Sequence, residues 1–518
     1  MGANVPFGFV QLGPTSIPQT WDWCSGYNYA DTTVIGFGHT HLSGTGIGDL
    51  NDISLMPVVG KVTPGRGTAG DPSSGMWSRF SRADERCAPG YYATRLLRYG
   101  IGVELTASPR VGMSRYAFPA SDDAGIVLDL ENGQGWDRST DCGITACSDR
   151  TVEGWRYSTG WADDQRVYFH AEFSKPFERI VFTGADTLSA DGRSARGRKL
   201  YGRFGFRTEE NERITVKVGL SAVSAENARR NMQAECPGWD FEAVRRNQVD
   251  TWNDLFSRLT VKTNDRLEKV RFYNNMYRAI CSRNTWSDVN GQWVSTDGKV
   301  HTVADPSEDV ILGCDAFWNT FWNLNQFWNL VTPEWSSRWV NSQLAMYDAN
   351  GWLAKGPAGM NYIPVMVGEH EIPLIVSAWQ MGIRDFDAKK ALEASVKMQT
   401  TPAQKVFKGF AGNRDLTAYM AHHYVPYDKG RFSNTMEYSY DDWTVGQLAK
   451  ALGDEETYRT FNDRGYWWRN VISDEGYCHM RDSKGQWLEN FDPFRSGANQ
   501  HYVEGNAWQL TFFVPQDV

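Results

Sequence analysis

The 518-residue sequence lacks several features that mark particular classes of protein. It contains no run of about 18 apolar residues, so we expect no membrane-spanning helix. It has no stripe of Lys and Arg, and its net charge is −9, which argues against a nucleic-acid partner. It also has no segment of low hydrophobicity and high charge, so we expect the chain to fold throughout.

Targeting and cysteine signals are sparse as well. The first seven residues, Met1 to Phe7, do not form a basic region followed by an apolar one, so we expect the sequence to be that of a mature form or a fragment. None of the eight cysteines forms a CxxC pair, which argues against a structural zinc site. Cys142 and Cys147 are five residues apart, and we predict that they form a local disulfide, which would favour an oxidising compartment.

Aromatic residues, in contrast, are abundant. They make up 14% of the chain and include 22 Trp. Trp is bulky and costly to expose without a use. The rings either stack against the C–H faces of sugars or fill a large aromatic core, and composition leaves both interpretations open.

The first half of the chain has a β-like pattern. Short apolar runs alternate with Gly, Pro, Asp and Asn up to about residue 235, for example at 8–12, 125–130 and 213–218. This pattern predicts an N-terminal antiparallel β-sandwich over residues 1–238. A linker helix is expected within residues 239–262, where apolar residues share one helical stripe and Asp240 is suited to be the N-cap.

Beyond the linker the apolar period becomes helical. A closed (α/α)6 toroid needs twelve helices, and about eight can be identified over residues 263–518, so we predict an incomplete toroid, by analogy with glycan-processing enzymes. The candidate helices lie near residues 265–283, 315–330, 333–349, 368–383, 385–399, 435–452, 455–471 and 504–514.

Five ordered motifs carry a resemblance to a known family. In the N-terminal half they are Val5–Leu12, Trp23–Tyr27 and Ile35–Gly46, and in the helical half Glu437–Trp443 and Tyr502–Gln509. Together they resemble the signature blocks of glycoside hydrolase family 92, the calcium-dependent exo-α-mannosidases. The resemblance covers essentially the whole chain.

The resemblance implies a β-sandwich followed by a helical barrel, with inverting, Ca²⁺-assisted hydrolysis of terminal α-mannosides. Inversion requires one carboxylic acid to protonate the leaving oxygen and one carboxylate to activate water. The implied partners are mannose-containing glycans such as N-glycans or mannans. We therefore expect a secreted or periplasmic protein.

Glu504 matches the position of the family's general acid. A structural alternative is a carboxylate in the first turn of a helix, where it would stabilise the helix dipole. The acid role requires a raised pKa, and we expect Trp508, Tyr502 and Phe512 to raise it by removing water.

In the N-terminal half, two residues are candidate substrate contacts. His39 and His41 alternate as strand residues do, but Ca²⁺ prefers oxygen ligands. We expect His41 to donate a hydrogen bond in a mannose pocket instead. Trp23 either stacks on the sugar or seals a domain interface.

In the helical half, the segment 313–322 departs from the Trp-Asp-Thr-aromatic-Arg pattern that the resemblance leads us to expect, because Asn319 and Trp322 replace the Asp and the Arg. We expect Trp318 to bind substrate and Asp315 to take over polar contacts with mannose hydroxyls. The substitutions leave the linkage preference open.

Two charged clusters complete the candidate substrate-binding residues. Glu369 and His370 either bind a hydroxylated ligand or begin a solvated helix. Asp441 and Asp442 either contact the sugar or cap and crosslink helices.

Family members continue with Gly-Asn-Glu-Pro-type and Gly-Asn-Asp-Asp-type segments, which carry calcium-site and general-base residues. Neither occurs before Val518, and an Asn-Pro-Phe-Ile-Gly-like lead-in is also missing. We therefore expect that the sequence is shortened at both ends, that the metal ligands lie beyond Val518, and that this chain alone lacks the general base. Two other functions stay open: uncapping of a mannose-1-phospho-6-mannose diester, and glycan binding without catalysis.

Overall fold

The computed structural model describes residues 2–41, 48–133, 135, 137–281, 283–313, 317–358, 361–362, 367–495 and 501–517. The chain divides into two compact units. The first comprises Met1–Val294, Lys299–Asp315 and Ala358–Met360, and the second comprises Ser295–Gly298, Ala316–Pro357 and Asn361–Val518.

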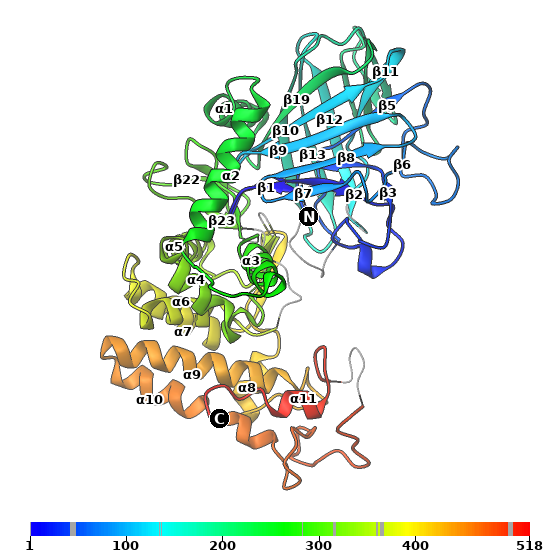
Figure 1. Cartoon of the computed structure of the whole chain (residues 1–518). Helices are drawn as coiled ribbons and strands as arrows, with labels where there is room; N and C mark the ends of the chain where they lie inside the picture. Colours follow the sequence, from blue (N-terminus) through cyan, green and yellow to red (C-terminus); the bar gives the residue numbers. More distant parts are fainter. Residues whose placement is uncertain are drawn as a thin grey trace. The chain divides into compact units, whose positions relative to one another are not determined.

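Two antiparallel sheets form most of the first unit (Figure 1). In the described residues one sheet has seven strands, in the order β1 (Ala3–Asn4), β2 (Gln11–Thr15), β4 (Gly36–Gly38), β5 (Ser54–Val59), β11 (Ser121–Asp129), β18 (Tyr201–Thr208) and β15 (Arg179–Thr183). The other has ten, in the order β16 (Thr187–Leu188), β17 (Ser194–Gly197), β12 (Arg138–Ala146), β13 (Thr151–Thr159), β14 (Gln165–Phe173), β19 (Glu212–Ser221), β10 (Val111–Phe118), β9 (Ile101–Ala107), β8 (Tyr91–Leu96) and β7 (Arg86–Ala88).

The inner faces of these sheets meet in an apolar core. Along β13 every second residue is buried, which is the pattern of a strand with one face on a core. Phe173 on β14 and Phe204 on β18 join the two sheets, with ring centroids 5.2 Å apart. The predicted sandwich is therefore confirmed.

The predicted strands agree with the structure in two places out of three. Residues 125–130 and 213–218 fall in β11 and β19, apart from Leu130. The strand predicted at 8–12 is wrong at its start, since β2 begins at Gln11. Phe7 has a φ of 57° and the Gly8 N–H donates to the Val5 carbonyl, so a turn occupies these residues instead.

The predicted disulfide between Cys142 and Cys147 is wrong. Cys142 lies within β12, and Cys147 follows the end of this strand. A strand rises about 3.3 Å per residue, so five residues separate the two Cα atoms by roughly 16 Å, whereas a disulfide needs less than about 7 Å. Both thiols are free in the structure.

Three helices also belong to the first unit: α1 (Ala225–Glu235), α2 (Phe241–Ser257) and α3 (Arg266–Ile280). The linker helix is confirmed as α2, and the Asp240 side chain caps it by accepting from the Ala243 N–H. Helix α1 was not predicted. The structure groups residues 263–294 with the first unit, whereas the sequence assigned them to the barrel.

The second unit is helical, as predicted from the period of its apolar residues. Its helices, including two short 3-10 turns, are η2 (Thr320–Trp322), α4 (Leu324–Val331), α5 (Pro333–Asn350), α6 (Glu371–Gln380), α7 (Ala388–Thr400), α8 (Leu416–His422), α9 (Asn434–Leu452), α10 (Glu455–Arg464), η3 (Trp467–Val471) and α11 (Ala507–Thr511). Only α8 lies outside the predicted ranges.

Short elements complete the fold. In the first unit they are η1 (Trp21–Trp23), β3 (Thr33–Val34) paired with β6 (Ser78–Arg79), β20 (Asn284–Thr285) paired with β23 (Leu312–Gly313), and β21 (Gln292–Val294) paired with β22 (Val300–Thr302). In the second unit β26 (Gln404–Val406) pairs with β27 (Gly409–Ala411), and β25 (Asn361–Tyr362) is a two-residue strand. The two residues of β24 (Pro357–Ala358) are divided between the units, Pro357 in the second and Ala358 in the first.

Helix α9 is the central helix of the second unit. It packs against α6, α7 and α10, and α10 returns beside it after the turn at Gly453 (Figure 1). Because neighbours surround it, α9 buries polar residues as well as apolar ones. Buried polar groups need partners, so the contacts of its carboxylates are informative.

No helix in the described part of the chain is long and apolar enough to cross a membrane.

Candidate functional site

Three carboxylates of α9 are almost completely buried: Glu437, Asp441 and Asp442. Residues four apart share a face of a helix, so Glu437 and Asp441 point toward the same neighbours. Asp442 is rotated by about 100° from Asp441 and by about 140° from Glu437, and it meets different partners.

Asp441 faces the start of α6. Its Oδ2 accepts a hydrogen bond from the Glu369 N–H at 2.6 Å, and its Oδ1 lies 3.8 Å from His370 Nε2. Gly368 permits this close approach, because a Cβ at this position would lie 2.6 Å from His370 Nε2 and 3.2 Å from Asp441 Oδ2. Burial raises the pKa of Asp441 to about 7, although His370 and the Glu369 N–H act in the opposite direction.

Asp442 crosslinks helices. Its two oxygens meet the Arg464 guanidinium at 3.0 and 2.9 Å, and Oδ2 also accepts from the Tyr419 hydroxyl. Arg464 donates in turn to the Gln399 carbonyl at the end of α7. Burial raises the pKa of Asp442 to about 6, against the lowering effect of Arg464. These contacts favour the structural interpretation of Asp442, and its sugar contact stays a prediction.

The start of α6 is buried rather than solvated. Glu369 and His370 are at most 1% exposed, so the alternative of a solvated helix start is wrong. Lys355 Nζ lies 2.7 Å from Glu369 Oε1. Burial, together with repulsion from Glu369, holds the pKa of the neighbouring Glu371 well above its usual range.

His370 connects this buried cluster to Glu437. Its Nε2 lies 2.9 Å from Glu437 Oε2, and its Nδ1 accepts a hydrogen bond from the Asn319 N–H at 3.2 Å. The Trp318 indole N–H donates to the other oxygen of Glu437 at 3.1 Å. Burial lowers the pKa of His370, but the carboxylates of Asp441, Glu437 and Glu369 outweigh it and raise this pKa above its ordinary value.

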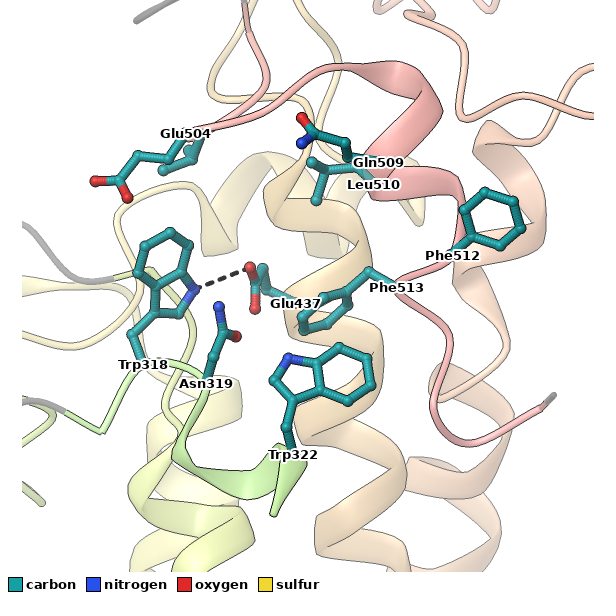
Figure 2. A pocket seen from close by; sticks show the side chains of 10 residues that line it. Trp318, Asn319, Trp322, Glu437, Glu504, Gln509, Leu510, Phe512 and Phe513 are labelled. Carbon is teal, nitrogen blue, oxygen red and sulfur yellow. Dashed lines mark hydrogen bonds between the residues drawn. The ribbon is translucent and has the colours of Figure 1, made fainter. Parts of the chain in front are cut away.

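Glu437 opens onto a pocket of about 240 Å³ within the second unit. Figure 2 shows its carboxylate beside the Trp318 indole, with Asn319 and Trp322 from the same segment and α11 across the pocket. The pocket has two walls, one formed by residues 318–322 and the other by residues 503–513. The lining residues are Trp318, Asn319, Trp322, Glu437, Val503, Glu504, Gln509, Leu510, Phe512 and Phe513.

Glu504 lines the same pocket from a turn before α11. The helix begins at Ala507 and is capped by Asn506, so Glu504 is not in its first turn. The Glu504 side chain is exposed and has a backbone φ of 52°. The expected desolvation is not found, because the Glu504 side chain is itself exposed; of the three rings expected to cover it, Tyr502 is buried and Trp508 and Phe512 are 44% and 68% exposed.

Trp23 and His41 lie in the first unit, and each has partners there. The Trp23 indole N–H donates to Asp31 at 2.9 Å. His41 Nδ1 lies 2.7 Å from the Gln11 carbonyl, and burial lowers the pKa of His41 to about 4. A neutral His41 therefore uses its only ring N–H on Gln11, and the predicted donation to a sugar is not available to it.

The remaining predictions concern Asp315 and calcium. Asp315 lies outside the described residues. In the part of the chain that the structure describes, no group of three or more His, Cys, Asp and Glu side chains is placed to hold a metal ion. The metal ligands are expected beyond Val518, so the calcium requirement stays a prediction.

The structure brings together five predicted residues of the second unit, namely Trp318, Glu369, His370, Asp441 and Glu504, around or behind one pocket. It adds Glu437, which was quoted within a motif but not selected. Its i, i+4 spacing from Asp441 was the available signal. Glu371 belongs to the same charged cluster of the sequence as Glu369 and His370, whereas Lys355 has no comparable sequence signal.

Comparisons with known proteins agree with this architecture. Residues 1–221 match the model of the glycosyl hydrolase family 92 N-terminal domain, and residues 227–518 match that of the family's catalytic domain. An uncharacterized secreted glycosidase of Arthroderma benhamiae is 23% identical, over 100% of this chain and 69% of its own length.

Solved structures give the same result. A family GH92 α-mannosidase of Bacteroides thetaiotaomicron is 32% identical to this chain, with a TM-score of 0.93. The match covers 100% of this chain and 69% of that one. The same mannosidase has also been solved in complex with mannoimidazole. An inverting GH92 mannosidase of the same species is 25% identical with a TM-score of 0.86, covering 99% and 67%. With both family models matched along almost all of its length, the chain belongs to glycoside hydrolase family 92.

Proposed function

We propose that this protein is an exo-acting α-mannosidase that removes terminal α-linked mannose from N-glycans or mannans with inversion of configuration. The observation that carries the proposal is the pocket in which Glu504, at the motif position of the general acid, and Glu437 lie among aromatic rings. Two carboxylates and flat apolar faces suit a sugar ring, which offers hydroxyls at its edge and C–H groups on its faces.

Glu504 is the proposed general acid. Its exposed side chain can turn over the pocket, where a protonated carboxyl would transfer its proton to the glycosidic oxygen as the bond to the anomeric carbon breaks. A water molecule would attack the opposite face of the sugar and give the inverted product. We assign no residue as the base that deprotonates this water.

Calcium dependence also belongs to the proposal, and it rests on the family resemblance alone. No step of the reaction is routed through the metal. Loss of activity in the presence of EGTA, with recovery on adding Ca²⁺, is the expected result. Secretion or a periplasmic location is proposed because of the secreted relative.

The pocket argues against a mannose phosphodiester as the substrate. No Lys or Arg is among the described residues that line it, and its two ionisable side chains are both acidic. A phosphate oxygen there would meet carboxylates without a cation to offset the repulsion. The pocket therefore favours a neutral glycoside.

The test is mannose release from α-1,2-mannobiose and a high-mannose glycan by the full-length protein, wild type and E504Q. Proton NMR of the first product separates inversion from retention. If Glu504 is the acid, E504Q loses about 10²- to 10⁴-fold in kcat/KM on mannobiose. It loses much less on 2,4-dinitrophenyl α-mannoside, whose leaving group needs no proton.

The matched control is E489Q, which changes an exposed glutamate outside the pocket and should retain wild-type rates. Equal losses by E504Q on both substrates would contradict the acid role. A wild-type protein that binds mannosides without hydrolysing any of them would favour the glycan-binding alternative.

A further inference from the structure

A buried row of polar side chains lies behind the pocket and is not explained by the proposed chemistry. It runs from Asp441 through His370 to Glu437 and ends at the Trp318 indole. Asp441, His370 and Glu437 are each at most 2% exposed, yet Glu437 lines the cavity. Buried ionisable groups are expensive, so this arrangement calls for a use.

The contacts of His370 define its tautomer. Because Nδ1 accepts the Asn319 N–H, it carries no proton in the neutral ring, and the ring proton is on Nε2. Nε2 is the atom that lies 2.9 Å from Glu437 Oε2. The ring therefore carries its N–H on the side of Glu437, and Phe321 packs edge-on against the same ring at a centroid distance of 4.9 Å.

The Trp318 indole N–H therefore donates to one oxygen of Glu437, and His370 Nε2 lies at ion-pair distance from the other. An ionised carboxylate accepts about four hydrogen bonds, so capacity remains on the side that faces the pocket. Within the described residues His370 is the only basic group at ion-pair distance from Glu437. Trp322, which stands where the family pattern has Arg, supplies no charge.

We propose that Glu437 is a sugar-binding residue whose carboxylate accepts hydrogen bonds from hydroxyls of the ring in the pocket, and that His370 is the residue that positions it. Trp318 and His370 fix the carboxylate before the sugar arrives, which avoids the cost of ordering it on binding. This inference rests on the proposed function, in that the pocket takes a mannose ring.

The test compares His370→Gln with His370→Met in the full-length protein. A glutamine amide can reproduce both contacts, accepting from Asn319 through its oxygen and donating to Glu437 through its nitrogen, whereas methionine can reproduce neither. The affinity for mannose and mannoimidazole is measured by calorimetry, and KM and kcat are measured with mannobiose. We expect H370M to weaken binding and raise KM about tenfold, and H370Q to stay within about threefold of wild type.

Glu437→Gln removes the charge, and we expect affinity to fall about 10- to 100-fold. The matched control is E371Q, because Glu371 is equally buried and does not line the pocket. E371Q should bind as the wild type does. Wild-type affinity in E437Q, or equal losses in H370Q and H370M, would overturn the proposal.

Should H370M fail to fold, E437D gives an independent test. Aspartate keeps the charge but withdraws both oxygens by one methylene, so wild-type affinity in E437D would also overturn the proposal. Failure of the proposed function would give a different result. If the wild type binds mannose through Glu437 but hydrolyses no mannoside, the mannosidase assignment is wrong and this inference stands. Hydrolysis that is intact in E437Q removes the inference alone.

Discussion

Replacing Arg464 by methionine should destabilise the centre of the second unit. Arg464 is 4% exposed, and its guanidinium contacts both oxygens of Asp442 and the Gln399 carbonyl. Methionine preserves much of the apolar stem and removes all three polar contacts. Asp442 is left with the Tyr419 hydroxyl as its remaining partner in the described residues.

The magnitude follows from the burial of the pair. Breaking a buried ion pair by removing one partner costs about 3–5 kcal/mol, because it leaves a charge without compensation. Asp442 will take up a proton rather than stay charged, which limits the loss at low pH. Its folded-state pKa is already raised to about 6 from 3.8, so the folded state binds this proton more tightly than the unfolded state does. The loss in R464M should therefore be larger at pH 8 than at pH 5.

Hydrogen exchange of the α9 and α10 amides measures this effect locally, without assuming that both units unfold together. A loss of about 3–5 kcal/mol corresponds to exchange that is roughly 10²- to 5 × 10³-fold faster. The double variant D442N/R464M should lose about 2 kcal/mol less than the sum of the single losses.

Arg459→Met on the outer face of α10 is the matched control, since Arg459 and its partner Glu455 have side chains 81% and 68% exposed. It should change stability by less than about 0.5 kcal/mol. Exchange in R464M that matches R459M would refute the argument that this pair holds α9 in place.

Two further predictions concern the pocket and the buried row. Trp318→Phe keeps the aromatic face and removes the N–H donor to Glu437, so KM for mannobiose should rise about tenfold with kcat little changed; an unchanged KM would contradict the contact. Asp441→Asn removes a carboxyl whose folded-state pKa is raised to about 7 from 3.8. Ionising that carboxyl costs more free energy in the folded state than in the unfolded state. The free energy of unfolding of the wild type should therefore fall, relative to that of D441N, as pH rises from about 4 to 7. Calorimetric Tm values at pH 4.5 and 7.5 check this, and a constant Tm difference would contradict it.

The sequence predicted helix α9 and its motif, but not which carboxylate has which role. Asp441 and Asp442 are neighbours in the sequence, and the helical rotation between them sends one to the start of α6 and the other to Arg464. That division depends on which helices pack on each side of α9. Sequence spacing contains no information about those neighbours.

Glu504 shows a similar limit. Its motif was sufficient to select it, and the structure places it at the pocket. Its surroundings were predicted wrongly, because proximity in sequence to Trp508 and Phe512 does not mean contact: both rings belong to α11 or its end, and both are largely exposed.

By itself the sequence determined the two structural classes along the chain, the linker helix with its Asp240 cap, and the family to which the chain belongs. These follow from local periodicity, capping chemistry and ordered motifs, all of which are properties of contiguous residues. Only the tertiary structure decided that Trp318 and His370 both contact Glu437 at a pocket, with Lys355 and Glu371 in the buried cluster behind it. These residues come from separate segments, and it is long-range helix packing that brings them together and removes them from water.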